Sequence, residues 1–375
     1  MTSEPARAVP ASFLPAGSTI GILGGGQLGR LLALAAAKLG MRTHIYCPDP
    51  DSPAFEVTPN KTIAAYDDKK ALTAFARSVD IVTYEFENVP AATATLIADL
   101  VPLAPDARAL AISQDRLQEK AFLQNARVAI CPFAPVLNAT DLKGAIKSIG
   151  LPAVLKTTRL GYDGKGQRIV KTREQAQHAF NELSRVPGEK PQMVLEAFVP
   201  FEKEISVIVA RNHKEEIAVY DPAENIHLNH ILHTSTLPAR ITPQTAHEAT
   251  EIATRIAKSL NYCGVLGVEF FVSKRGQTQQ LLVNEIAPRV HNSGHWTESV
   301  CPTSQFEQHI RAICNWPLGS TRRYADVVME NLVGETISTV PGSLSQNEQP
   351  NVYGKSKIRA GRKMGHINRI LPPSG

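Results

Sequence analysis

Two glutamates on neighbouring apolar runs are the side chains of this sequence best suited to chemistry. Glu269 lies within GVEFF and Glu285 ends LLVNE, and a turn at Ser273–Gln277 separates the two runs. Two acids on adjacent buried strands repel each other and lose solvation. Mg²⁺, or Mn²⁺ in its place, would relieve both costs while binding substrate phosphates, and Asn284 would add a neutral oxygen. The alternative is that basic residues pair with the acids, and Arg289 could serve one of them.

A lysine and a glycine-rich loop upstream of these acids suit a bound triphosphate. Lys156 ends the apolar run Leu151–Leu155, where a charge without a partner is costly, and a triphosphate would supply that partner. Glycines in the following loop would let backbone amides approach phosphate oxygens. The loop is not a Walker A motif, because glycine follows its lysine, and taken alone it favours an ordinary hairpin turn. Its residues are Gly161, Tyr162, Asp163, Gly164, Lys165, Gly166 and Gln167.

Two later segments are rich in groups that bind anions. The run Arg289–Trp296 follows Glu285 closely and is dense in hydrogen-bond donors, which suits an anionic substrate or a developing negative charge. Its alternative interpretation is a polar loop. Basic residues also cluster near the C-terminus, where a clamp on a single phosphate fits a short folded lobe better than a nucleic-acid tail does. These are Lys355, Lys357, Arg359, Arg362 and Lys363.

A glycine motif near the N-terminus raises a rival interpretation. Gly24–Gly29 matches G-x-G-x-x-G between an expected strand and helix, and Asp49 lies 20 residues further on. This is the dinucleotide fingerprint in its expected context and would make the protein a nicotinamide-dependent dehydrogenase. The same turn also brings backbone amides to any phosphate or carboxylate at a helix N-terminus. Nearby, Tyr84–Asn88 ends a strand, and its acids could accept ribose hydroxyl protons.

The elements that must position these residues fall into two classes. From Ser18 to about Pro105, β-rich runs alternate with helical ones, which predicts a wound parallel sheet. The strands expected there are Thr19–Leu23, Thr43–Cys47, Thr62–Ala65, Ile81–Tyr84 and Val101–Ala104, and the helices are Gln27–Leu39, Asp68–Ser78, Ala91–Leu100 and then Ser113–Asn125.

The middle of the chain carries many strands and few helices, which predicts an α+β domain with antiparallel sheet. After Pro317 the periodicity is weak, and we expect a small terminal lobe. The strands expected in the middle are Ala153–Thr157, Arg168–Lys171, Met193–Phe198, Ile205–Ala210, Ile217–Tyr220, Gly264–Val272 and Gln279–Ile286, and the helices are Arg173–Ser184 and Pro243–Leu260.

Composition narrows the class of protein. The 375 residues are 43% hydrophobic and 20% charged, as in globular chains of two or three domains. The five cysteines form no C-x-x-C pair, which argues against a disulfide framework or zinc knuckle and fits a reducing cytoplasm. No apolar run reaches about 18 residues, so we expect no membrane span. A net charge of +5, spread along the chain, does not favour nucleic-acid binding.

Several stretches together resemble the N5-carboxyaminoimidazole ribonucleotide synthetase family of ATP-grasp enzymes. NEIAPRVHNSGHWT (Asn284–Thr297) is long and highly specific, whereas the others would be weak alone. The resemblance covers nearly the whole chain. The other stretches are GGGQLGR (Gly24–Arg30), YEFENVP (Tyr84–Pro90), QDRLQEK (Gln114–Lys120), GYDGKGQ (Gly161–Gln167), YDPAENIH (Tyr220–His227), QFEQHIRAI (Gln305–Ile313) and GRKMGH (Gly361–His366).

The resemblance implies an ATP-grasp fold, with mixed α/β and α+β domains. A loose leader, 1–17, would precede a wound pre-ATP-grasp domain at 18–115. The ATP-grasp domain would occupy 116–317, with a mobile lid at about 150–200, and a small C-terminal domain would follow at 318–375.

The resemblance also implies a role for each candidate residue. Lys156 and Arg116 would hold ATP phosphates, Glu196 would face the adenine at the hinge, and Glu204 would take the ribose. Glu269 and Glu285 would bind the metal. The remaining ATP-binding residues would be Ala197, Phe198, Val199, His227, Asn284, Glu285 and the Gly161–Gln167 loop. The ribonucleotide site would hold Gln27, Leu28, Glu87, Arg289, Asn292, Ser293, Lys355 and Arg362, and the catalytic residues would be Asp163, Arg289, Lys355 and Arg362.

The implied reaction is the ATP- and bicarbonate-dependent carboxylation of 5-aminoimidazole ribonucleotide in purine biosynthesis. Carboxyphosphate would be the intermediate, and ADP and phosphate would be released. The family further implies a cytoplasmic homodimer that passes its product to N5-carboxyaminoimidazole ribonucleotide mutase. Three alternatives stay open: another ATP-grasp ligase or carboxylase acting on a phosphoribosyl substrate, the nicotinamide-dependent dehydrogenase, and a non-catalytic ATP-binding protein.

Overall fold

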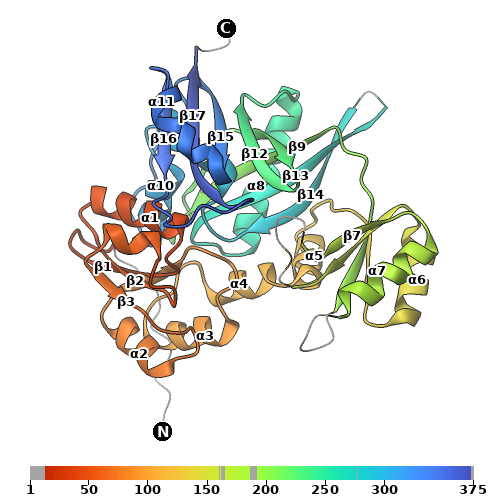
Figure 1. The fold of residues 1–375 in the computed structure, drawn as a ribbon, viewed down its shortest axis with the longest axis horizontal. Helices are drawn as coiled ribbons and strands as arrows, with labels where there is room; N and C mark the ends of the chain where they lie inside the picture. Colours follow the sequence, from red (N-terminus) through yellow and green to blue (C-terminus); the bar gives the residue numbers. More distant parts are fainter. Residues whose placement is uncertain (1–12, 160, 162–164, 186–191, 277, 373–375) are drawn as a thin grey trace.

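The N-terminal part of the molecule contains a four-stranded parallel sheet. The computed structural model describes residues 13–159, 161, 165–185, 192–276 and 278–372 (Figure 1). Its first sheet has the order β3-β2-β1-β4, with every pair parallel, which confirms the predicted wound sheet. The elements are β1 (Thr19–Leu23), α1 (Gln27–Lys38), β2 (Arg42–Tyr46), η1 (Pro53–Val57), β3 (Asn60–Thr62), α2 (Lys69–Arg77), β4 (Ile81–Tyr84) and α3 (Ala91–Leu100).

Two expectations for this part are wrong. Val101–Ala104 is not a strand and makes only one parallel bridge, between Leu103 and Val82, because Pro102 cannot donate to a ladder. The helix expected at Ser113–Asn125 begins three residues later, as α5 (Arg116–Asn125), and an unexpected helix, α4 (Ala107–Ser113), precedes it. Asp115 separates them, since its side chain accepts hydrogen bonds from the amides of Leu117 and Gln118 and starts the second helix.

A second lobe stands apart at one end of the molecule (Figure 1). Its four antiparallel strands have the order β5-β8-β6-β7, and its apolar side chains form a separate core. Sequence periodicity did not reveal α6, which contains Gly144 in its middle. The elements are β5 (Phe133–Val136), α6 (Ala139–Ile149), β6 (Ala153–Thr157), β7 (Gln167–Val170), α7 (Arg173–Leu183) and β8 (Met193–Ala197).

The rest of the chain forms a nine-stranded sheet and the helices that pack on it. Its path is β14-β13-β9-β11-β12-β15-β17-β16, with β10 paired to β9, so the strands after Pro317 extend this sheet. The elements are β9 (Lys203–Arg211), β10 (Ile217–Val219), β11 (Ala223–Leu228), β12 (Ile231–Leu237), α8 (Pro243–Ser259), β13 (Gly264–Arg275), β14 (Thr278–Ala287), η2 (Asn292–Gly294), α9 (Thr297–Val300), α10 (Gln305–Ile313), β15 (Asp326–Val333), η3 (Gly334–Thr339), α11 (Val340–Ser343), β16 (Glu348–Val352) and β17 (Lys363–Leu371).

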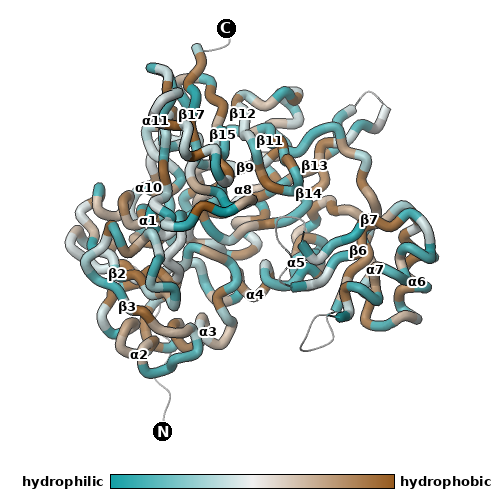
Figure 2. The backbone as a smooth tube through the Cα atoms, viewed as in Figure 1, coloured by the Kyte–Doolittle hydropathy of each residue, from teal (hydrophilic) through white to brown (hydrophobic). Residues whose placement is uncertain are grey.

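Apolar packing ties the N-terminal sheet to the large sheet but leaves the second lobe separate. One core runs from Ile22 and Leu32 through Trp296 and Ile310 to Met329. Hydrophobic stretches occur in every part of the molecule (Figure 2). The amide of Leu14, within the predicted leader, donates to the Cys314 carbonyl (3.0 Å), so this residue is fixed to the second half of the chain. All five cysteines are buried free thiols.

Among the described residues, no helix is both long and apolar enough to cross a membrane.

Candidate active site

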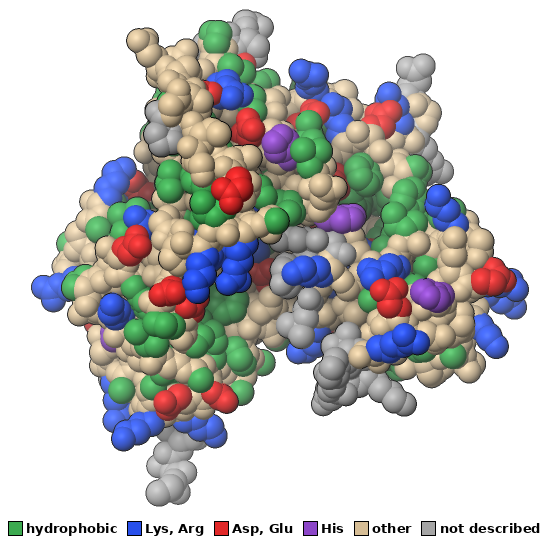
Figure 3. All heavy atoms as spheres, in the orientation of Figure 1, with side chains coloured by type: hydrophobic (Ala, Val, Ile, Leu, Met, Phe, Trp, Pro, Cys, Tyr) green, Lys and Arg blue, Asp and Glu red, His purple; other side chains and the backbone are tan. Residues whose placement is uncertain are grey.

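A cavity of about 740 Å³ lies where the N-terminal part, the second lobe and the large sheet meet. Lysines and arginines gather near the middle of the face that this region presents (Figure 3). Most of the predicted site residues line the cavity, although they come from distant parts of the sequence. These are Gln27, Leu28, Glu87, Arg116, Lys156, Gly161, Lys165, Gln167, Glu196, Ala197, Phe198, Val199, Glu204, His227, Glu269, Asn284, Glu285, Arg289 and Asn292.

Some predicted residues lie off this surface. Ser293, Lys355, Arg362 and Gly166 are not part of the cavity wall, and the predicted Tyr162, Asp163 and Gly164 fall outside the described residues. Gly166 has φ +72° and its carbonyl accepts from the Thr157 amide (2.8 Å). It therefore belongs to the β6–β7 hairpin, the alternative that the loop alone favoured.

The two glutamates meet across a bulge. Glu269 on β13 lies directly opposite Glu285 on β14, and the register then shifts so that Phe270 pairs with Val283. Asn284 is the extra residue on β14. Successive side chains of a regular strand point to opposite faces, but a bulge lets neighbours share one. Asn284 and Glu285 accordingly both line the cavity with Glu269.

Each acid has one protein partner, and neither partner is Arg289. His291 Nε2 lies 3.2 Å from Glu269 Oε1, and Arg116 Nη1 lies 3.2 Å from Glu285 Oε2. The alternative of a basic partner therefore holds for Glu285, but that partner is Arg116, because Arg289 pairs with Glu87. Burial, together with the charge of Glu285, raises the pKa of Glu269 to about 7. The pair is thus short of positive charge on its cavity side.

This donor set fits Mg²⁺. It offers two carboxylates and an amide oxygen on one wall, and Mg²⁺ takes one or two protein carboxylates together with substrate phosphates and water. Within the described ranges, no group of three or more His, Cys, Asp or Glu side chains could hold a metal by itself. The fit is therefore to a metal that arrives with a phosphorylated ligand rather than to a protein-only cage.

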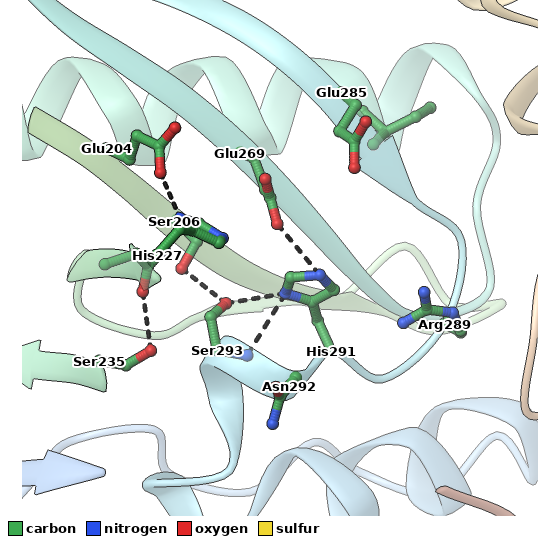
Figure 4. Close-up of polar contacts among 12 residues, drawn as sticks. Glu204, Ser206, His227, Ser235, Glu269, Glu285, Arg289, His291, Asn292 and Ser293 are labelled. Carbon is green, nitrogen blue, oxygen red and sulfur yellow. Dashed lines mark hydrogen bonds and ion pairs between the residues drawn. The ribbon is translucent and has the colours of Figure 1, made fainter. Parts of the chain in front are cut away.

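His291 connects the Glu269 wall to the segment Arg289–Trp296 (Figure 4). Its Nδ1 lies 2.8 Å from Ser293 Oγ, and Ser206 Oγ lies 2.6 Å from the same oxygen. Burial lowers the pKa of His291 to about 3, and the Arg289 charge acts in the same direction. A neutral ring held at both nitrogens fixes the direction of the Glu269 carboxylate.

Lys156 already has a partner in the protein, so its charge does not by itself require the triphosphate that was expected to supply one. Its Nζ lies 2.8 Å from Glu196 Oε2, and the buried Lys120 lies 3.1 Å from Glu196 Oε1. Although burial favours the neutral acid, the charges of Lys156 and Lys120 lower the pKa of Glu196 to about 2. Two lysines against one carboxylate leave a net positive charge at this end of the cavity. Sequence reasoning overlooked Lys120.

Two phenylalanine rings line the same cavity as Lys156 and Glu196. Phe201 and Phe271 stack with ring centroids 4.6 Å apart, and both line the cavity. Two stacked rings present a flat apolar surface, which suits contact with an aromatic base. Sequence reasoning did not assign them, yet a signal existed for Phe271, which lies two residues after Glu269 and so shares its face of β13.

Glu204 and His227 form a second acid–imidazole pair on the wall (Figure 4). Burial lowers the pKa of His227, but the hydrogen bond and charge of Glu204 outweigh burial and raise it overall. Glu204 can accept ligand hydroxyls only with the oxygen that His227 does not hold.

The N-terminal glycine turn already holds an anion, which is the carboxylate of Glu85. Glu85 accepts hydrogen bonds from the amide of Gly26 and, at 2.7 Å, from that of Gly29. A Cβ on Gly24 would come within 2.4 Å of Glu85. The glycines therefore make room for an internal acid, and the dinucleotide interpretation of the turn is wrong. Of the candidates in this region, Gln27, Leu28 and Glu87 face the cavity.

Lys355 lies at the edge of the site rather than in its wall. Its Nζ donates to the Lys363 carbonyl (2.7 Å), and Lys363, a member of the predicted basic cluster, itself lines the cavity. Burial lowers the pKa of Lys355 to about 8, and the neighbouring Arg362 contributes. Arg362 Nη1 donates to the Lys357 carbonyl (2.7 Å). The predicted basic clamp is thus assembled from one turn of the C-terminal segment.

Three known protein families match successive parts of the chain. Residues 17–114 match the ribonucleotide synthetase preATP-grasp domain, residues 121–306 match the ATP-grasp domain, and residues 327–373 match the phosphoribosylaminoimidazole carboxylase C-terminal domain.

Similar proteins agree with these matches. The N5-carboxyaminoimidazole ribonucleotide synthase of Brucella melitensis is 50% identical over 362 residues, which are 96% of this chain and 98% of the relative. That of Bacillus subtilis is 42% identical, covering 95% and 92%. The Staphylococcus aureus synthetase complexed with ADP superposes with a TM-score of 0.90 at 36% identity (97% and 96% covered). The Aspergillus clavatus enzyme, in complex with ADP and 5-aminoimidazole ribonucleotide, gives 0.87 at 27% (96% and 95%).

Proposed function

The chain belongs to the N5-carboxyaminoimidazole ribonucleotide synthase family, and from this membership we infer the reaction that it catalyses. It is an ATP-grasp ligase that forms the carbon–nitrogen bond of N5-carboxyaminoimidazole ribonucleotide in de novo purine synthesis. The observation that carries this conclusion is the match over nearly the full length of the curated relatives. The nicotinamide-dependent alternative is not favoured, because Glu85 fills the place that a pyrophosphate would take.

The reaction proceeds in two displacements. An oxygen of bicarbonate attacks the γ-phosphorus of ATP, the bond to ADP breaks, and carboxyphosphate forms. The exocyclic amine of 5-aminoimidazole ribonucleotide then bonds to the carboxyl carbon, either of carboxyphosphate or of carbon dioxide released from it, and inorganic phosphate and the amine proton are released. Because phosphoryl transfer needs alignment and charge neutralisation more than covalent help, the side chains of this chain act chiefly by position.

At the nucleotide end, Lys156 and Arg116 orient the phosphates, and Glu269 and Glu285 hold Mg²⁺. The chemistry supplied by Mg²⁺ at this position is neutralisation of the phosphate charge. The stacked rings of Phe201 and Phe271 provide a flat apolar surface for the base, next to Glu196 and the strand end Ala197–Val199. Glu204, steadied by His227, accepts a ribose hydroxyl.

At the ribonucleotide end, Gln27 and Glu87 face the substrate from the N-terminal part. Arg289, held by Glu87, faces it from the loop after β14, with Asn292 and Ser293 beyond. Lys355 and Arg362 bind the 5′-phosphate. The Gly161–Gln167 loop, with Asp163 as its acid, closes over bicarbonate and excludes water, because water would hydrolyse carboxyphosphate.

The second lobe acts as the lid. Its separate core and its link to the large sheet through Pro132 and residues 198–202 suit motion as a unit, whereas the N-terminal sheet shares a core with the large sheet. Closure would bring Lys156 and the loop toward Glu285. We keep the domain limits 18–115, 116–317 and 318–375. The lobe proposed as the lid runs from β5 (Phe133–Val136) to β8 (Met193–Ala197), so it begins earlier than the expected 150–200.

ADP release tests the reaction. With bicarbonate present, we expect ADP to appear rapidly only when 5-aminoimidazole ribonucleotide is added, and ¹³C-bicarbonate to label the product. Equal ADP release with and without the ribonucleotide would rule out this acceptor. A different phosphoribosyl amine that stimulates release more strongly would point to another ligase of the superfamily.

Assembly and location follow from family membership. We expect a homodimer, so light scattering should give twice the chain mass of 40.7 kDa. We also expect a cytoplasmic enzyme whose product passes to N5-carboxyaminoimidazole ribonucleotide mutase. A monomer at micromolar concentration would overturn the first of these expectations.

A further inference from the structure

The last strands reach back to the N-terminal part at a single glycine. Gly354 follows β16 and has φ +71°, a conformation that side chains disfavour. A Cβ at this position would come within 2.7 Å of Glu56 Oε2 and 3.1 Å of Arg30 Nη1. The backbone of Gly354 therefore rests directly on two charged side chains from another part of the chain.

Those two side chains form a fixed support. Arg30, on α1, donates through Nη1 to Glu56 Oε2 (2.5 Å) and to the Pro53 carbonyl (2.9 Å). Glu56 and Pro53 both belong to η1. The guanidinium of Arg30 thus links α1 to η1, and Gly354 packs against the Arg30–Glu56 pair. Arg30 ends the run GGGQLGR, one of the stretches that carry the family resemblance, yet the proposed reaction gives it no role.

The residues on either side of Gly354 belong to the C-terminal strands and to the substrate site. Tyr353 is fully buried, its amide donates to the Met364 carbonyl, and its hydroxyl lies 2.9 Å from His366 Nδ1. Lys355 lies over the Tyr353 ring, 5.6 Å from its centroid. Lys355 is therefore held from the C-terminal side by Tyr353 and from the N-terminal side through Gly354.

We propose that the Arg30–Glu56 pair is a positioning device for Lys355. By supporting Gly354, the pair sets the distance between the basic clamp of the C-terminal segment and the N-terminal wall that carries Gln27 and Glu87. Arg30 and Glu56 touch no substrate and act only through Gly354. The inference rests on the proposed role of Lys355 in binding the ribonucleotide phosphate.

The test compares Michaelis constants for the two substrates. Arg30→Ala and Gly354→Ala should each raise the KM for 5-aminoimidazole ribonucleotide about tenfold, because a small misplacement of a phosphate ligand is costly. The KM for ATP should stay near the wild-type value in both variants. The unfolding temperature should stay near wild type in Arg30→Ala, whereas Gly354→Ala strains the backbone and should lower it. Arg30→Lys keeps one charged nitrogen and should restore most of the loss.

Asp221→Asn provides a matched control. The Arg323–Asp221 pair has a length of 2.9 Å and side-chain exposures of 21% and 58%, against 20% and 55% for Arg30–Glu56, but it lies away from Gly354. This variant should leave both KM values unchanged. The contrast separates a positional effect from the general loss of an exposed ion pair.

A double-mutant cycle tests the contact itself. If Gly354 acts through the pair, Glu56→Ala combined with Gly354→Ala should raise the ribonucleotide KM no more than the larger single change does. Two effects that multiply, or an ATP KM that rises equally, would overturn the proposal. If wild-type enzyme failed to release ADP in response to the ribonucleotide, the proposed function would fall instead, so the two failures are distinguishable.

Discussion

The buried Glu85 and the Glu269–Glu285 pair of the cavity wall differ in what satisfies their charge. Glu85 receives two backbone amides at the start of α1 and needs no ligand. Glu269 and Glu285 face each other across a bulge with one side-chain partner each. Burial raises the pKa of Glu85 and of Glu269, but backbone amides oppose the shift only at Glu85. Glu85, whose carboxylate accepts two backbone amides, stabilises the fold. Glu269 and Glu285 have fewer partners within the protein and face the cavity, where a ligand can supply more.

The largest effect should come from the under-satisfied pair. Glu285→Gln removes half of the charge that would hold Mg²⁺ and should slow ADP formation about a thousandfold, since electrostatic groups of this kind dominate phosphoryl transfer. The unfolding temperature should hold or rise, because one of two repelling acids is gone. Turnover close to wild type would remove the metal assignment. Glu348→Gln, on an exposed pair with Arg369, is the control.

Replacing Glu85 should have the opposite effect, with a loss of stability and no change in the KM for ATP. Glu85→Ala leaves the amides of Gly26 and Gly29 without an acceptor, a loss of about 1–3 kcal/mol for each buried group. In a chain of this size the unfolding temperature should fall by roughly 5 °C, measured by calorimetry. The KM for ATP should not move, since Lys156 and Glu196 lie in the second lobe. An ATP-specific defect without loss of stability would mean that the turn binds nucleotide after all.

Local sequence signals were enough to identify Glu269 and Glu285 but not to predict that Glu85 binds the glycine turn. Glu269 and Glu285 stand out because charge interrupts apolar strands, and β1, β4, α3 and β6 agree with the expected limits to the residue. The partner of the glycine turn could not be predicted, because Glu85 lies 56 residues from Gly29 and no pattern specifies which anion enters.

The C-terminal strands escaped prediction for a related reason. β16, EQPNV, has a polar and proline-containing sequence and is a strand only because β17 pairs with it at the edge of the large sheet. Its position brings Gly354 against Glu56 and Arg30, which lie 298 and 324 positions earlier in the chain. The cluster of basic residues predicted that Lys355 belongs to a phosphate clamp but carried no information on which residues support it.

A third, smaller effect concerns the ribonucleotide side alone. Arg362→Ala removes one charged contact of the proposed phosphate clamp, worth about 1.5–3 kcal/mol, so the KM for 5-aminoimidazole ribonucleotide should rise roughly tenfold or more. The KM for ATP should change less than twofold, because the two ends of the cavity use different residues. Initial rates with each substrate varied in turn provide the measurement. A defect confined to ATP would contradict the division of the cavity.

The smallest effect is a shift in pH dependence, and it tests whether Lys355 acts as a charge. Burial lowers the pKa of Lys355 to about 8, with Arg362 contributing. The lysine is charged below this pKa and neutral above it, so kcat/KM for the ribonucleotide should fall as pH rises through about 8, while kcat/KM for ATP should not show that step. In Arg362→Ala the neighbouring like charge is gone, and the step should move to higher pH by less than about one unit. In Lys355→Met the step should vanish. A step that persists in Lys355→Met would belong to another group, and a step that moves down in Arg362→Ala would show that the two cations do not share one phosphate.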